Sequence, residues 1–107
     1  MDTSRDIIIQ KIAELAKTVI PKGGHLWLYG SQARGDFHND SDWDLLILLD
    51  KEKITSDDHD NCGYPFRELG WNLDATISPI LYTLSDWEKF SFTPFYKNVE
   101  QDKIVII

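Results

Sequence analysis

The chain has 107 residues and a mass of 12.4 kDa, so we expect a single domain over residues 1–107, too small for an added substrate domain. Hydrophobic residues make up 42% of the sequence and aromatic residues 12%, which predicts a folded globule and excludes a disordered chain. The formal net charge of −7 argues against direct binding of nucleic acid, because lysine and arginine hold phosphate backbones.

Cysteine usage and hydropathy bear on the compartment. Cys62 is the single cysteine, so no internal disulfide can form, and a reducing cytoplasm is the expected location. No window approaches the ~18–20 apolar residues of a membrane span. The N-terminus lacks the basic-then-apolar order of a signal peptide. We therefore expect a cytoplasmic protein without a membrane segment.

The first predicted element is a helix over residues 6–20. Apolar side chains recur there at helical spacing, at positions 8, 12, 15, 16 and 19. Asp6 near its start and Lys17 near its end complement the helix dipole, and Pro21 ends the helix. This helix is expected to cover one face of a sheet and to carry no chemistry.

A strand is expected at residues 26–29, followed directly by Gly30 and Ser31. Glycine lets a ligand approach the backbone closely, and Ser31 can cap a helix whose free N–H groups suit phosphate. A role for Ser31 as a helix cap alone is the alternative. His25, at the edge of this strand, is expected to be structural.

Two aspartates open the next apolar run. In a strand, Asp42 and Asp44 point to the same side about 7 Å apart, and Trp43 points away. Two carboxylates on one face repel each other unless a cation lies between them. Residues 45–49 are apolar without alternation, which is typical of a strand buried on both faces. A divalent metal beside a phosphate-binding turn is therefore the first hypothesis.

These two motifs together resemble a known family. Gly30-Ser31-Gln32-Ala33-Arg34-Gly35 and Ser41-Asp42-Trp43-Asp44-Leu45 are similar to the Gly-Ser-x-Ala-Arg-Gly and Ser-Asp-x-Asp-Leu signature of the minimal nucleotidyltransferases, in the DNA polymerase beta superfamily. Either half alone is unspecific, but both halves at this separation between apolar runs are fairly specific. The resemblance covers nearly the whole chain. It implies an α/β fold, with a small mixed sheet of about three or more strands and helices packed on it.

The third strand is expected at residues 71–78, where Leu73, Ala75 and Ile77 share one face and Asp74 lies on the other. The resemblance implies a third carboxylate on the strand that neighbours the Asp-x-Asp strand. Asp74 is the acid in this run able to supply it. A solvent-facing strand residue without a role in the site is the alternative for Asp74.

The resemblance also implies a reaction, the transfer of a nucleoside monophosphate, with AMP from ATP as the expected case, to an acceptor hydroxyl. Two Mg²⁺ ions are expected, one held by Asp42 and Asp44 and a second shared by both with Asp74. Asp74 is also the expected general base. Gly30 and Ser31 are expected to hold the β- and γ-phosphates.

Arg34 could reach a triphosphate or pair with nearby aspartates, and the sequence leaves both roles open.

Minimal members of the family resemble the antitoxin half of a toxin-antitoxin pair, whose partner is a small helical HEPN-type protein. Such a partner, modified on a tyrosine, would suit the acidic chain better than a polyanion.

Two other interpretations compete with transfer: a non-catalytic module, and a calcium-binding structural domain built on the acidic segment. A non-catalytic module could keep the fold and bind nucleotide or protein without transferring anything. Residues 36–60 hold nine of the 18 acidic residues, but without the regular ligand spacing of a calcium loop. His38 and His59 lack a second ligand at zinc spacing.

The remaining elements are less distinct. A helix is expected at residues 56–69 with Ser56 as its cap, and it includes Cys62 as an incidental thiol. Ser85-Asp86-Trp87-Glu88 has the form of a capping box that starts a short helix. The apolar residues 103–107 are expected to help close the core.

Overall fold

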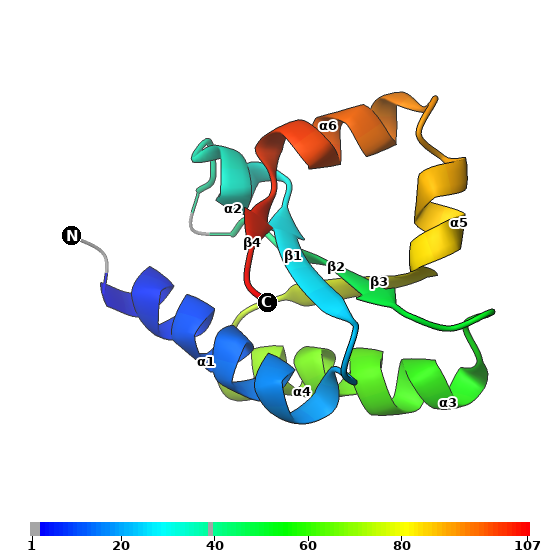
Figure 1. Ribbon diagram of the computed structural model, residues 1–107. Coiled ribbons are helices and arrows are strands. Elements are labelled where there is room, and N and C mark those ends of the chain that lie inside the picture. Colours follow the sequence, from blue (N-terminus) through cyan, green and yellow to red (C-terminus); the bar gives the residue numbers. More distant parts are fainter. Residues whose placement is uncertain (1–2, 39) are drawn as a thin grey trace.

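The computed structural model describes the backbone of residues 3–38 and 40–107 and has a mixed sheet at its centre (Figure 1). The sheet contains β1 (His25–Tyr29), β2 (Trp43–Leu49), β3 (Ile77–Thr83) and β4 (Ile104–Val105), in the order β3-β2-β1-β4. β2 runs antiparallel to β1 and parallel to β3, and β4 pairs antiparallel with β1. The predicted mixed α/β sheet is confirmed.

Helices cover both faces of this sheet (Figure 1). One face carries α1 (Thr3–Val19) and α4 (Tyr64–Asn72), the latter preceded by α3 (Ser56–Asp58) and the π-helical turn η1 (His59–Gly63). The other face carries α5 (Leu84–Lys89) and α6 (Pro94–Asp102). The short helix α2 (Ser31–Arg34) lies in the connection between β1 and β2. Across the described residues, no helix is long and apolar enough to cross a membrane.

The central strand β2 is buried on both faces, as its unbroken apolar run predicts. Leu45, Ile47 and Leu49 join the core formed with α1 and α4. Leu46 and Leu48 pack on the other side, in the core formed with α5 and α6. All five side chains are at most 2% exposed, so β2 holds the two helical layers together.

Several predicted elements are confirmed with small shifts in their ends. The predicted N-terminal helix is α1, the predicted strand at residues 26–29 is β1, and the predicted helix at residues 56–69 is the segment from α3 to α4. The predicted third strand at residues 71–78 is wrong in its bounds. Residues 71 and 72 still belong to α4, and β3 begins only at Ile77.

Packing at the end of α4 explains this difference. The Leu73 N–H donates to the Leu69 carbonyl at 3.0 Å, so helical hydrogen bonding runs past the expected strand start. The Ala75 N–H then donates to the Gly70 carbonyl at 2.9 Å and folds the chain back over the helix. A Cβ at Gly70 would lie 2.7 Å from the Ala75 carbonyl oxygen, so glycine permits this close return.

The helix caps also differ from the predicted ones. The N-cap before α3 is Thr55, not Ser56, and the N-cap before α5 is Thr83, not Ser85. In both places the threonine one or two residues earlier has the extended backbone that an N-cap requires. The predicted capping box at residues 85–88 is therefore wrong, because Ser85 already lies within α5.

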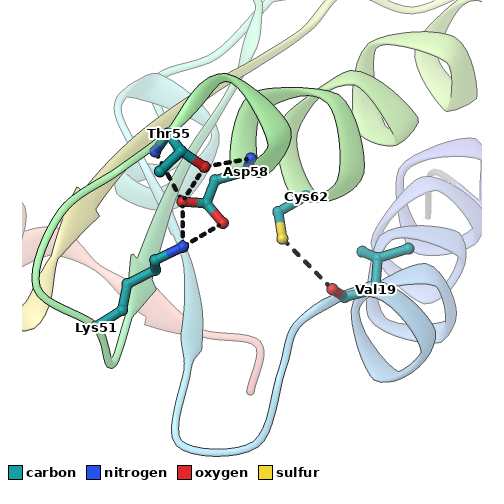
Figure 2. Close-up of polar contacts among 5 residues, drawn as sticks. All are labelled: Val19, Lys51, Thr55, Asp58 and Cys62. Carbon is teal, nitrogen blue, oxygen red and sulfur yellow. Dashed lines mark hydrogen bonds and ion pairs between the residues drawn. The ribbon is translucent and has the colours of Figure 1, made fainter.

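Figure 2 shows the cap before α3 together with its ion pair. Thr55 Oγ1 accepts a hydrogen bond from the Asp58 N–H at 3.3 Å, and the Thr55 N–H donates to Asp58 Oδ2 at 2.8 Å. Lys51 Nζ lies 2.7 Å from the same carboxylate oxygen, and this hydrogen bond holds the pKa of Asp58 below its ordinary value. Nearby, the buried Cys62 thiol donates to the Val19 carbonyl at 3.6 Å, and burial raises the pKa of this thiol.

Thr55→Ala is expected to lower the free energy of unfolding by about 1 kcal/mol, because the first turn of α3 loses its side-chain acceptor. Ser56→Ala is the matched control, since Ser56 is exposed and lies inside the helix. Its expected effect stays within about 0.5 kcal/mol. Urea unfolding of both variants measures the difference, and an equal loss in the two would contradict the assignment of Thr55 as the cap.

Candidate functional site

Three polar side chains form a row across the sheet near the start of β2. Tyr29 on β1 pairs with Asp44 on β2, and Asp44 pairs with Ser78 on β3. Residues paired in this way point to the same face of a sheet. This is the face of α5 and α6, because Leu46 and Leu48 follow Asp44 at two-residue steps and pack there.

Trp43 and Asp44 lie on opposite faces of β2, as strand alternation predicts, whereas Asp42 lies outside the strand. Trp43 is 4% exposed and packs into the core on the α1 side, while Asp44 is half-buried on the opposite face. Asp42 is exposed and comes just before β2. Burial raises the pKa of Asp44, the Asp42 charge raises it further, and the Arg34 charge opposes both.

The charge of Asp44 also affects the pKa of Tyr29. Burial and then the Asp44 charge raise the pKa of the Tyr29 phenol to about 12, so the phenol stays neutral and can donate a hydrogen bond. Among the residues that the structure describes, no lysine or arginine forms an ion pair with Asp42 or Asp44. The two carboxylates therefore repel each other without a paired protein cation, which is an arrangement suited to a metal cation.

The turn after β1 brings backbone next to this carboxylate. Gly30 has φ 74° and ψ −159°, a conformation open to glycine. A Cβ placed on Gly30 would overlap Asp44 Oδ2, so glycine is needed for the carboxylate to lie against the turn. The N-cap of α2 is Gly30 itself, so the predicted capping role of Ser31 is wrong. Within the described residues the Ser31 hydroxyl makes no hydrogen bond, which leaves it available to a ligand.

Arg34 forms ion pairs, one of the two roles that the sequence left open. Its Nε lies 3.3 Å from Asp36 Oδ1 and its Nη1 lies 3.9 Å from Asp102 Oδ2, at the end of α6. The Arg34 side chain remains 45% exposed. It borders a cavity of about 170 Å³, which is lined by Tyr29, Gly30, Arg34, Phe95, Asn98, Val99 and Asp102.

Asp74 lies elsewhere. It is exposed in the turn between α4 and β3, not on a strand, and its φ of 54° is left-handed. It lines a cavity of about 550 Å³ together with Trp43, whose side chain points away from Asp44. No group of three histidine, cysteine, aspartate or glutamate side chains that could hold a metal occurs in the described part of the chain. The structure thus brings Asp42 and Asp44 together and leaves Asp74 apart.

Comparison with known proteins identifies the family. The profile of the family described as Polymerase beta, Nucleotidyltransferase matches residues 10–106. The chain belongs to this family. The match includes the glycine turn and the Asp-x-Asp strand, so it confirms the family inferred from those two motifs. No curated protein matches this nucleotidyltransferase domain significantly.

Solved structures share the fold of this nucleotidyltransferase domain. A crystal structure of a toxin-antitoxin with AMP-PNP has a TM-score of 0.62 at 22% identity, covering 92% of this chain and 72% of the matched chain. A crystal structure of a mutant of the toxin-antitoxin MntA-HpeT has a TM-score of 0.60 at 20% identity, again covering 92% and 72%. These similarities confirm the polymerase-beta-like fold.

Sequence reasoning missed three residues around the nucleotidyltransferase site. Strand alternation alone places Tyr29 on the face of β1 opposite to that of Leu28. Its position beside Asp44 depends on the register of β1 against β2. Ser78 could not have been found, because its neighbour depends on the register of β3 against β2. Asp102 could not either, since only the docking of α6 brings it to Arg34.

Proposed function

We propose that the chain is a metal-dependent nucleotidyltransferase that moves a nucleoside monophosphate, with AMP from ATP as the expected case, onto an acceptor hydroxyl. One observation carries the proposal. The Gly30 turn lies so close to Asp44 that a Cβ would overlap the carboxylate, so backbone groups suited to phosphate and a carboxylate pair suited to metal adjoin each other. Family membership supports the same reaction class.

The donor set fits one divalent metal ion. Asp42 and Asp44 would hold Mg²⁺, since both supply hard oxygen ligands and neither pairs with a cation among the described residues. When bound, Mg²⁺ would neutralise triphosphate charge and stabilise the departing pyrophosphate. The predicted role of Asp74 as a third ligand and general base stays a prediction, and the geometry lends it no support.

The residues of the chain itself bind and orient the substrate. Gly30 and Ser31 hold the β- and γ-phosphates through the open turn and the unbonded hydroxyl. Arg34 exchanges an aspartate partner for phosphate oxygen. The acceptor oxygen forms a bond to the α-phosphorus while the bond to the bridging oxygen breaks, pyrophosphate leaves with that electron pair, and the acceptor proton passes to solvent.

A protein acceptor suits this chain. The net charge of −7 disfavours a polynucleotide, and the two solved structures described above are both of a toxin-antitoxin, one of them with AMP-PNP. The proposed partner is a small helical HEPN-type protein that is modified on a tyrosine. The proposed location is the cytoplasm, where ATP is available and Cys62 stays reduced.

The second candidate is a non-catalytic module that binds nucleotide without transferring it. A specific observation favours it, because Asp74 does not join Asp42 and Asp44. Such a module would retain the metal-nucleotide site and act through the complex that it forms.

Transfer of label from ATP marked at the α-phosphate separates the two candidates. The assay contains Mg²⁺, the protein, and the product of any adjacent small helical gene. We expect label on the partner with the wild type and loss of at least about 1,000-fold with Asp42→Ala plus Asp44→Ala. Asp57→Ala plus Asp60→Ala, which removes two exposed acids of the helical segment, should transfer normally. Bound nucleotide without transfer to the partner or to small hydroxyl acceptors would favour the non-catalytic module.

A further inference from the structure

The residue beside Asp44 on the neighbouring strand is a serine. In the parallel pairing of β2 with β3, Asp44 lies opposite Ser78, and Leu46 and Leu48 lie opposite Ile80 and Tyr82. The latter four pack together in the core formed with α5 and α6. Ser78 therefore points to the face of Asp44, at the place where a third metal-binding side chain on β3 would have to be.

Asp74 has a structural reason to be where it is. Leu73 is the C-cap of α4, and Asp74 follows it with φ 54°, the left-handed turn that commonly ends a helix. Aspartate and asparagine accept this conformation more readily than most residues. The acid at this position thus ends α4, and its exposed side chain lies on the Trp43 side of the sheet.

Electrostatics favour a neutral group at Ser78. Asp42 and Asp44 already repel each other, and Asp44 and its neighbour Tyr29 are both partly buried. A third carboxylate in this row would be tolerated only with more cationic charge bound between the three. The Ser78 hydroxyl adds no charge, and within the described residues it makes no hydrogen bond.

We propose that this chain binds one divalent cation per nucleotide, through Asp42 and Asp44, and that Ser78 occupies the place at which a third carboxylate would hold a second cation. The inference rests on the proposed function and narrows its metal site. Its consequence is that β3 supplies no carboxylate base beside Asp44 for the acceptor hydroxyl. The metal site still binds the nucleotide. Because β3 supplies no base, the transfer rate depends on the acidity of the acceptor hydroxyl or on a base that the partner supplies.

The first test counts cations without any transfer. Mn²⁺ is titrated into the protein with a non-hydrolysable ATP analogue, and free Mn²⁺ is read from its electron paramagnetic resonance signal. We expect one Mn²⁺ per protein–nucleotide complex, lost in Asp42→Asn plus Asp44→Asn and unchanged in Asp74→Asn, since asparagine keeps the left-handed turn. Two Mn²⁺ in the wild type, with one lost in Asp74→Asn, would overturn the inference and leave the proposed function standing. No bound Mn²⁺ would overturn both.

The second test adds the missing group. Ser78→Asp is expected to bind a second Mn²⁺ and to raise the rate of transfer by about 100-fold, since it supplies both a ligand and a base. Ser91→Asp, at an exposed serine beyond α5, is the matched control and should change neither quantity. A folded Ser78→Asp variant, checked by thermal unfolding, that still binds one Mn²⁺ would overturn the inference. Should that variant fail to fold, the wild type and Asp74→Asn counts decide alone.

Discussion

Gly30→Ala is expected to remove nucleotide transfer, by about 100-fold or more, while the chain stays folded. The new Cβ would overlap Asp44 Oδ2, so the carboxylate or the turn must move by an ångström or more. A displacement of this size at reacting groups costs about 100-fold in rate. The backbone at φ 74° and ψ −159° adds strain of about 1–3 kcal/mol for any residue with a side chain.

Gly35→Ala separates the strain from the collision. Gly35 also has a positive φ, of 90°, but a Cβ there meets nothing within 4 Å. Both variants should lose stability in urea unfolding, whereas the Gly30 variant alone should lose transfer and Mn²⁺ affinity. If the Gly35 variant loses as much activity, the contact between Gly30 and Asp44 is not what the site requires.

Local patterns account for much of this fold. The unbroken apolar run of residues 45–49 predicts a strand covered on both faces, and both helical layers do pack on it. The helical stripe in residues 6–20 likewise predicts α1. In each case the burial pattern lies within one element, so its period can be read without knowing what the element touches.

The helix caps show what local sequence patterns cannot predict. Thr55 and Ser56, or Thr83 and Ser85, have similar capping propensities, and only the backbone conformation selects the threonine. At Gly30 the cap carries no side chain, so Ser31 is free for another role. Capping propensity locates the start of a helix only to within a residue or two. That precision is too low to decide whether one particular hydroxyl, such as that of Ser31, caps the helix or is available to a ligand.

The wrong bounds of the third strand are the more instructive case. Leu73, Ala75 and Ile77 alternate as a strand would, but this span is short enough to be a helix end, a turn and the start of β3. Asp74 is then a turn residue, and the strand neighbour of Asp44 is Ser78. Register between two strands is a non-local property, so the residue that lies beside Asp44 could not be read from the order of acids along the chain.

Trp87→Ala is expected to lower the free energy of unfolding by about 3–5 kcal/mol, the largest stability loss that we predict for a single substitution. Trp87 is 1% exposed and lies at the centre of an aromatic cluster on the α5 and α6 face. Its ring centroid is within 4.8–6.4 Å of those of four other rings: Trp27, Tyr82, Phe95 and Tyr96. Its Nε1–H also donates to Glu100 Oε2 at 2.9 Å, so alanine leaves a cavity and removes this hydrogen bond.

Trp71→Ala is the matched control, because Trp71 is 65% exposed and its ring contacts that of Tyr64 at the surface of α4. Its loss should stay within about 1 kcal/mol. Since Phe95 packs on Trp87 and also lines the cavity beside Gly30 and Arg34, Trp87→Ala should in addition weaken binding of the nucleotide analogue under conditions where the variant is folded. Equal unfolding midpoints in urea for the two variants would show that α5 and α6 contribute little to the fold. Unchanged nucleotide affinity in the folded Trp87 variant would instead show that the site does not depend on how α6 is packed.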